Sequence, residues 1–446
     1  MKNVDRTKAP EVYELTMPKL PALKTYRLPS GIEMNVLTRD RGQESCPQSR
    51  LTGSQSGICR ISLMLLHPGG TQDIVAEREM LRMLSRGSQL WPGKRLSDVL
   101  AINGTKTQIG CNAYNTTVAW DVLNARFDNV IRPIRDMIVQ PKFSRPTYAV
   151  LRRKSVSNAM KIMEQVTFLA LVELHKMLYG NDCPLAKLPT PDNVRAVTLD
   201  GIRRQWFSSL QPENMRLFIA GDVTPEIEQK LAEAFSDMPA PTEGACQAKT
   251  RKCAPLTPEV MSVAVPRDSS LQSAVLAAIP TPVKHFTEDH LRLQMATTLL
   301  GGFFGSRLCR NIREEKGLTY GIGTFADNVF DTTDIKIYTN CKRGTGPQVI
   351  DEIRSELRRL ADPATYTATE VDNLRRFILT VYANYFETPL SLSDFIQTQI
   401  SRTGSNRAAW HIRTASRLLR ELSPESLAHA ASLWLNPDAL VTATVG

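Results

Sequence analysis

Long apolar runs are missing from this chain of 446 residues. No window approaches the roughly eighteen consecutive apolar residues of a membrane-spanning helix. The opening stretch, MKNVDRTKAPEVYELTMPKLPALK, also lacks the apolar core and the small-residue cleavage site of a signal peptide. We therefore expect a cytoplasmic protein with no membrane contact.

Grouped metal-binding side chains are missing as well. The eight cysteines include no Cys-x-x-Cys pair, so we expect reduced thiols rather than a zinc knuckle or a redox motif. The six histidines are isolated; His285 and His290 are close, but a spacing of five is poor for a helical pair of ligands. No Ser-His-Asp or Cys-His grouping can be argued either, and so the residues themselves predict no metal site.

Basic residues are abundant but scattered. The net charge is +10, yet no basic run is interleaved with aromatic residues, and this distribution argues against nucleic-acid binding. With 42% hydrophobic and 22% charged residues, the composition is that of an ordinary globular protein, and the length suits two or three domains.

What the sequence does contain is an internal duplication. LQPENMRLFIAG at 210–221 matches LNPDALVTATVG at 435–446, with Leu, Pro, an acidic residue and a final Gly at the same spacing. Upstream, VIRPIRDMI from Val130 matches VIDEIRSEL from Val349, and LRRK from Leu151 matches LRRF from Leu374. Each half therefore reads as strand, helix, helix, strand pair, helix, long helices and a closing strand.

This order lacks strict alternation of strands and helices, and it predicts an α+β fold in which helices cover an antiparallel sheet in each half. The stretch from Met238 to Pro258 is rich in Pro, Thr and Lys and has no periodicity, which is typical of a linker. We expect domains at 1–240 and 260–446, joined by a linker at 241–259.

The second half contains the string SRLCRNIREEKGLTYGIGTF. We expect a helix over 306–316, ended by Gly317, followed by a strand. Spacing alone allows a plain interpretation, in which Arg313 pairs with Glu314 or Glu315 and Tyr320 is a half-buried strand residue.

The string closely resembles the second-domain signature of the pitrilysin/insulysin (insulinase) family of zinc peptidases, which includes the mitochondrial processing peptidase and short bacterial homologues. The resemblance extends over nearly the whole chain. It implies two α/β rolls that form a half clam shell around a peptide chamber. It also implies that Arg313 and Tyr320 reach into an active site, where they would donate hydrogen bonds to a peptide carbonyl and to the oxyanion formed on attack.

The family's first domain carries His-x-x-Glu-His on a helix, with two zinc ligands and the base that activates water. Counting back from Gly87 by the family's spacing places Arg78 and Arg82 at the two His positions and Leu81 at the Glu position. The third ligand falls on Ala159. Arginine has no lone pair for a metal and leucine cannot act as a base, so the resemblance implies a degenerate zinc site.

The family's substrate-binding edge strand usually carries an Asn-Ala pair. Counting from Gly104 gives Gln108 and Ile109 instead, and Asn112 with Ala113 is out of register. Addition of a peptide to this edge through backbone hydrogen bonds is therefore open.

These observations predict a non-catalytic subunit that binds no zinc or other cofactor, pairs with a zinc-bearing homologue and supplies Arg313 and Tyr320 to the partner's peptide-binding site. Peptide hydrolysis would then need the heterodimer. Two alternatives stay open: a purely structural scaffold subunit with no role in proteolysis, and an active peptidase with an unrecognised site.

Overall fold

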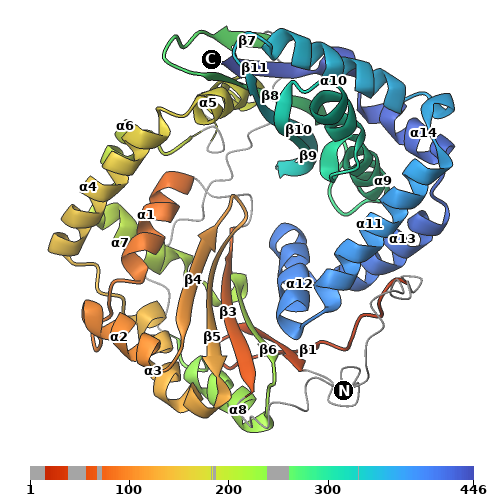
Figure 1. Ribbon diagram of the computed structural model, residues 1–446. Helices are drawn as coiled ribbons and strands as arrows, with labels where there is room; N and C mark the ends of the chain where they lie inside the picture. Colours follow the sequence, from red (N-terminus) through yellow and green to blue (C-terminus); the bar gives the residue numbers. More distant parts are fainter. Residues whose placement is uncertain are drawn as a thin grey trace, which may run out of the picture.

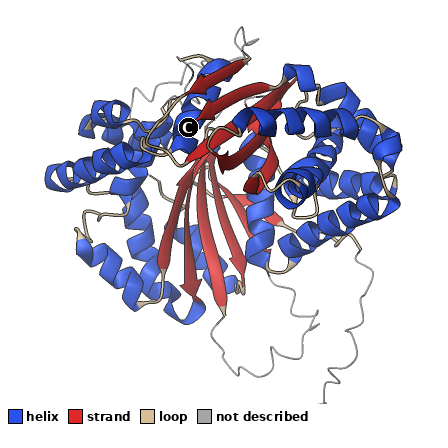
Figure 2. Cartoon of the chain, turned by 45° about the horizontal axis from the view of Figure 1, so that its top comes forward, coloured by secondary structure: helices blue, strands red, loops and turns tan. Residues whose placement is uncertain are grey.

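The computed structural model describes residues 16–38, 57–67, 73–181, 183, 187–238, 261–329 and 331–446. The predicted linker at 241–259 lies outside these residues. Within them, strands form two sheets, each backed by helices, as Figures 1 and 2 show. The α+β class expected from the sequence is confirmed.

The two sheets share one topology, except that the first has an additional edge strand, β1. The first has the order β1-β2-β6-β3-β5-β4 and the second the order β7-β11-β8-β10-β9. In each sheet the closing strand pairs in parallel with one neighbour, β6 with β2 and β11 with β7, and all other pairs are antiparallel. The first sheet contains β1 (Lys24–Arg27), β2 (Glu33–Thr38), β3 (Ile58–Leu66), β4 (Lys106–Cys111), β5 (Asn115–Leu123) and β6 (Met215–Gly221). The second contains β7 (Ser262–Val265), β8 (Gln272–Thr281), β9 (Thr319–Val329), β10 (Thr332–Lys342) and β11 (Val441–Val445).

Helices follow the same order in both halves. The first half has α1 (Ile74–Leu84), α2 (Lys94–Ile102), α3 (Phe127–Val139), α4 (Arg145–Ile162), α5 (Val166–Tyr179), α6 (Pro191–Ala196), α7 (Leu199–Ser209) and α8 (Pro225–Ala234). The second has α9 (Glu288–Thr297), the π-helical segments η4 (Thr298–Gly302) and η5 (Cys309–Glu315), α10 (Gly346–Leu360), α11 (Ala368–Phe386), α12 (Pro389–Thr403), α13 (Ala408–Arg420) and α14 (Pro424–Trp434).

The repeated Leu-x-Pro-acid motif has the same structure twice. Each copy forms a 3₁₀ turn, η3 (Pro212–Asn214) or η7 (Pro437–Ala439), and leads into a closing strand. A glycine in the left-handed region stands at the end of each strand: Gly221, the last residue of β6, with φ +122°, and Gly446, just after β11, with φ +148°. A Cβ there would come within 2.4 Å and 2.5 Å of a neighbouring strand backbone. The motif therefore ends each sheet where only glycine fits.

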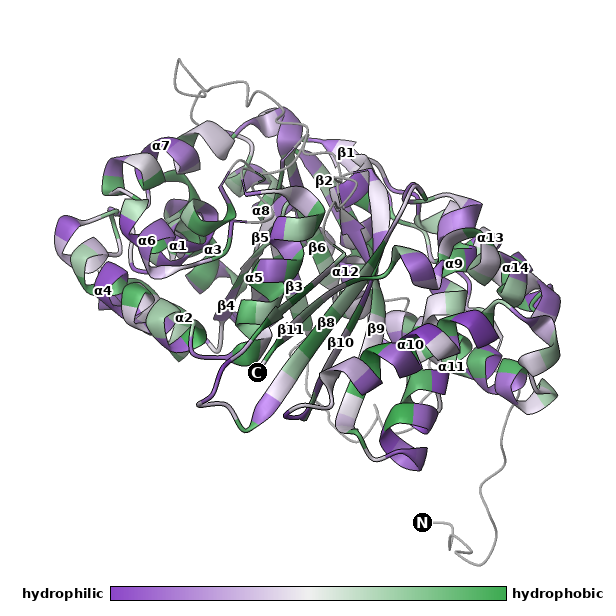
Figure 3. Cartoon of the chain, turned by 90° about the horizontal axis from the view of Figure 1, so that it is seen from above, coloured by the Kyte–Doolittle hydropathy of each residue, from purple (hydrophilic) through white to green (hydrophobic). Residues whose placement is uncertain are grey.

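Each half lends one helix to the other sheet. Helix α5 packs on β8 and β11, where Ala170, Leu174 and Leu178 join a buried cluster with residues of both strands. In return, α12 packs against β2, β3 and β6. Figure 1 shows α12 beside the first sheet and α5 beside the second, and Figure 3 shows the apolar strands β8 and β11 that α5 covers.

Polar contacts join the halves at the same places. From α12, Asp394 accepts a hydrogen bond from Arg60 on β3 at 3.1 Å. Arg402 of the same helix donates to the carbonyl oxygen of Asn328 at 3.0 Å and lies over the ring of Tyr114. The two sheets are therefore held together by reciprocal apolar and polar contacts, and not by the linker alone.

Candidate functional site

Helix α1 carries three of the four positions counted for the zinc site. Asp73 caps its N-terminus by accepting from the backbone amides of Val75 and Ala76 at 3.0 Å each. Arg78 and Arg82 are exposed one helical turn apart, whereas Leu81 is buried in the core of the first half.

The fourth position, Ala159, lies on α4, which packs against α1. Arg82 donates to the hydroxyl of Ser155 at 2.7 Å, and Ser155 donates to Glu79 at 2.7 Å. Arg82 is also 3.6 Å from the other carboxylate oxygen of Glu79. Ala159 is one helical turn beyond Ser155 and is buried in the same core as Leu81. The fold thus brings the two helices together, and a charge-assisted network joins them.

Sequence reasoning missed a second buried carboxylate. Glu77 is buried and accepts hydrogen bonds from Thr116 and Gln205, and His67 lies 3.4 Å away. Burial raises the pKa of Glu77, but the hydrogen bonds of His67, Thr116 and Gln205 outweigh burial and hold the pKa below its usual value. In the sequence of α1, Glu77 and Glu79 flank Arg78 next to a hydrophobic face of the helix. This pattern could have indicated that the carboxylates are buried and therefore need hydrogen-bonding partners.

Arg78 lies beside β4, the edge strand of the first sheet. Its side chain hydrogen-bonds Cys111, whose pKa is raised to about 11 by burial and by the charge of Glu77, while Arg78 opposes the rise. The thiol is therefore protonated at neutral pH. On the same strand, Gln108 donates to Asp121 at 2.8 Å and Ile109 is partly exposed. These two residues therefore do not supply the Asn-Ala pair that the family carries on its substrate-binding strand.

No metal-binding group forms in the described part of the chain. A search of these residues finds no cluster of three or more His, Cys, Asp or Glu side chains. Around the counted zinc positions the side chains offer guanidinium groups, and each carboxylate there is already bonded to Ser, Thr, Gln, His or Arg. The arrangement suits an ion-pair network better than a cation site.

Arg313 stands near the C-terminus of η5. A helix is present where the sequence predicts one over 306–316, and from Cys309 to Glu315 it is a π-helix. Gly317 ends it with φ +61°, as expected. The Arg313 guanidinium lies 3.7 Å above the ring of Phe304, and one of its N–H groups donates to Glu314 at 3.2 Å. The ion pair of the plain interpretation is therefore present.

Tyr320 is at the start of β9, the edge strand of the second sheet, and its side chain is 99% exposed. Between Thr319 and Ile322 the ladder gains one residue against β10, which makes a bulge at Tyr320 and Gly321. The Thr319 and Thr339 hydroxyls share a hydrogen bond of 2.6 Å, and both oxygens lie within hydrogen-bonding distance of the carbonyl oxygen of Gly321, at 3.0 and 2.8 Å. Bulges re-aim side chains, and this one leaves Tyr320 out of the sheet's core. The half-buried tyrosine of the plain interpretation is not observed.

Comparisons with known proteins agree with this picture. Residues 196–377 match a family model described as the peptidase M16 inactive domain. The chain is 19% identical over 300 residues to the non-peptidase homolog YmxG of Helicobacter pylori, covering 67% of this chain and 68% of that protein. It is 25% identical over 190 residues to an uncharacterized zinc protease of Streptomyces coelicolor, covering 42% and 41%, so that match spans less than half of the relative.

Solved structures share the fold. A protease from Helicobacter pylori superposes with a TM-score of 0.79 at 12% identity, covering 96% of this chain and all of the other. A peptidase M16 inactive domain from Pseudomonas fluorescens superposes with a TM-score of 0.77 at 17% identity, covering 96% and 98%.

The described chain is a two-half α+β protein with Arg78, Leu81 and Arg82 on α1 and Arg313 and Tyr320 at one end of the second sheet. Residues 196–377 are similar to the M16 inactive domain, and nearly the whole chain shares its fold with a solved M16 inactive-domain protein. Among the described residues no helix could cross a membrane.

Proposed function

We propose that the chain is a non-catalytic M16 subunit that pairs with a zinc-bearing homologue and completes its active site with Arg313 and Tyr320. One observation carries the proposal. The tyrosine that the family string assigns to the substrate is 99% exposed on a built bulge, whereas the chain's own zinc positions hold arginine, leucine and alanine.

The geometry supports a role in substrate binding. Phe304 contacts the flat face of the Arg313 guanidinium, so the in-plane N–H groups remain the donors. Together with the phenol of Tyr320, they suit the oxygen of a peptide carbonyl. Such donors bind more strongly when that oxygen becomes an oxyanion, and this difference is what accelerates a reaction.

The partner must supply what this chain lacks. A zinc ion would need ligands with lone pairs and a base for water, and neither Arg78, Arg82 nor Leu81 offers them. Relatives carry both kinds of name, a non-peptidase homolog and zinc proteases. We therefore place zinc in the partner subunit and peptide as the substrate of the complex.

The test uses the full chain and the homologue with His-x-x-Glu-His from the same genome, each alone and mixed. Bound zinc is measured by elemental analysis, and cleavage by a fluorogenic peptide. We expect no stoichiometric zinc in the isolated chain and cleavage only, or far more strongly, in the mixture. Arg313→Ala should lower kcat by roughly a hundredfold, the range for loss of one oxyanion donor.

The matched controls are Arg310→Ala, an exposed arginine of the same helix, and Tyr338→Phe, a half-exposed tyrosine of the next strand. Both should leave the rate unchanged, whereas Tyr320→Phe should lower it. If Arg313→Ala and Tyr320→Phe leave turnover of an intact complex unchanged, the chain is a scaffold. One zinc per isolated chain would overturn the proposal.

A further inference from the structure

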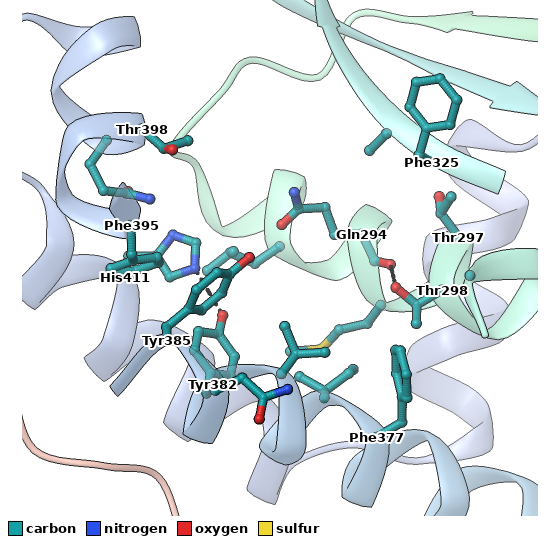
Figure 4. A pocket seen from close by; sticks show the side chains of 18 of the residues that line it. Gln294, Thr297, Thr298, Phe325, Phe377, Tyr382, Tyr385, Phe395, Thr398 and His411 are labelled. Carbon is teal, nitrogen blue, oxygen red and sulfur yellow. Dashed lines mark hydrogen bonds between the residues drawn. The ribbon is translucent and has the colours of Figure 1, made fainter. Parts of the chain in front are cut away.

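A pocket of about 710 Å³ lies in the second half, between α9, η4, the edge strand β9 and helices α11, α12 and α13. Figure 4 shows that rings surround it: Tyr382, Tyr385, Phe395 and His411 gather on one side, and Phe325 and Phe377 lie across from them. This combination of volume and aromatic lining is that of a small-molecule site. Nothing in the proposed function uses it.

The internal repeat locates this pocket. Met295, which lines the pocket, and Leu81, at the counted zinc site, occupy the same position in their helices. Each is the same number of residues beyond the N-cap, which is Thr287 in α9 and Asp73 in α1. On the facing helix, Tyr382 also lines the pocket. Tyr382 and Ala159 are the same number of residues beyond the Leu-Arg-Arg string of their helices, α11 and α4. The pocket therefore occupies, in the second half, the place counted for zinc in the first.

Three polar side chains in the lining carry buried atoms with no hydrogen-bond partner in the described part of the chain. These atoms are Oε1 of Gln399, Oγ1 of Thr297 and Nδ1 of His411. Gln399 and Thr297 are 3% and 2% exposed, so bulk solvent does not reach most of either residue. Unpaired buried polar groups are costly, and a side-chain rotation toward the pocket would let a ligand with donor and acceptor atoms satisfy them.

Charge narrows the ligand class. Besides His411 and the two tyrosines, Asp394 is the one ionisable side chain of the described lining, and it is already paired with Arg60 at 3.1 Å. Burial lowers the pKa of His411 to about 4, so the imidazole is neutral at pH 7. Its Nε2 is 2.8 Å from the hydroxyl of Tyr382. Among the described residues, no lysine or arginine lines the pocket to bind a phosphate or a carboxylate.

We propose that this pocket binds a neutral aromatic molecule of one or two rings that carries a hydrogen-bond donor. The rings of Tyr385, Phe395 and Phe377 would contact its faces, and Gln399 would accept from its N–H or O–H. The assignment does not depend on the subunit's role in proteolysis.

Indole and 4-methylphenol are the probes, with benzoate as the anionic comparison and toluene as the ring without a donor. Binding to the full chain is measured by calorimetric titration and by saturation-transfer NMR. We expect saturable binding of indole and 4-methylphenol at one site, and benzoate at least tenfold weaker because its charge finds no partner.

Two variants test whether the probes bind in this pocket. Ile378→Trp fills the cavity from α11 and should reduce binding more than tenfold, whereas Met160→Trp, at an exposed position of α4, should change nothing. Gln399→Leu keeps the shape and removes the acceptor. It should weaken indole and 4-methylphenol roughly fivefold and leave toluene unchanged.

No saturable binding of either probe up to its solubility overturns the proposal. So does benzoate binding as tight as that of 4-methylphenol, or probe binding that ignores both variants. If Ile378→Trp does not fold, the test rests on Gln399→Leu, which should weaken only the probes that carry a donor. Unchanged binding of toluene would show that the pocket of this variant is intact.

Discussion

The two halves of this molecule use one topology and differ where their first helix meets their first long helix. In the first half, Arg82, Ser155 and Glu79 join α1 to α4 through hydrogen bonds and an ion pair. In the second, the corresponding helices α9 and α11 line an aromatic pocket. The repeat thus preserves the backbone frame, while a few side chains decide whether this place holds an ion-pair network or a cavity.

The largest effect should come from restoring the counted ligands in the first half. The combined variant Arg78→His, Leu81→Glu, Arg82→His and Ala159→Glu should bind about one zinc per chain, with an affinity raised roughly a thousandfold or more over the unaltered chain. A chelator competition measures it. The control variant carries the other three substitutions but keeps Arg82, and it should bind zinc far more weakly. A folded variant with no gain in zinc affinity would show that the counted register is wrong.

The exchanged helices provide the next test. Leu174 of α5 and Ile396 of α12 are each 1% exposed. Leu174 belongs to the buried cluster that joins α5 to β8 and β11, and Ile396 to the core of the second half, which also includes residues of the first sheet. Leu174→Ala and Ile396→Ala should each lower the free energy of unfolding by about 2–5 kcal/mol. Chemical denaturation measures both changes. As a control, Val150→Ala at an exposed position of α4 should change the free energy of unfolding by no more than about 0.5 kcal/mol. An effect confined to one helix would contradict the reciprocal exchange.

Acid should weaken the second half through its histidines. Burial lowers the pKa of both His290 and His411 to about 4, and nearby charge adds to this in each case. The unfolded chain takes up their protons near pH 6.5, but the folded chain does so only near pH 4, so stability falls as the pH drops between these values. At pH 5 each would contribute a loss of about 2 kcal/mol.

Urea unfolding at pH 7.5 and pH 5 measures this loss, and His411→Gln should flatten the pH dependence. Glu77 does not interfere in this range, because its lowered pKa places its own loss at more acidic pH. An unchanged slope in His411→Gln would show that its imidazole titrates normally.

The smallest effect concerns the Arg313 side chain. Phe304 is 67% exposed, so Phe304→Ala should change the free energy of unfolding by less than about 1 kcal/mol. It should nonetheless speed the motion of the Arg313 guanidinium, measured by NMR of its Nε–H group, and Phe304→Tyr should restore the slower motion. Identical Arg313 signals in the alanine and tyrosine variants would contradict the stacking contact.

Much of the fold could be predicted from the sequence because the repeat is local and periodic. The Leu-x-Pro-acid motifs and the matched helices predicted an α+β chain with duplicated halves, and the structure has that order. The exchange of α5 and α12 could not be predicted, since an apolar helix face does not reveal which sheet covers it. The π-helical form of η5 was missed for a similar reason: its extra residue per turn depends on tertiary contacts.

The roles of Arg313 and Tyr320 stay predictions. Tyr320 is exposed at the start of β9 and Arg313 is partly buried near the end of η5, but neither the bulge under Tyr320 nor the ring of Phe304 under Arg313 could be read from spacing. Glu77 and the aromatic pocket were missed because both depend on residues far apart in the chain, such as Gln205 for the carboxylate and His411 for the pocket.

The most direct test of the central claim is the rate of peptide cleavage by the zinc-bearing homologue, with unaltered chain or with Arg313→Ala added at equal concentration. The account predicts strong stimulation by the unaltered chain and a roughly hundredfold smaller kcat with the variant, although the two complexes form equally well. Equal rates with both chains in intact complexes would contradict it.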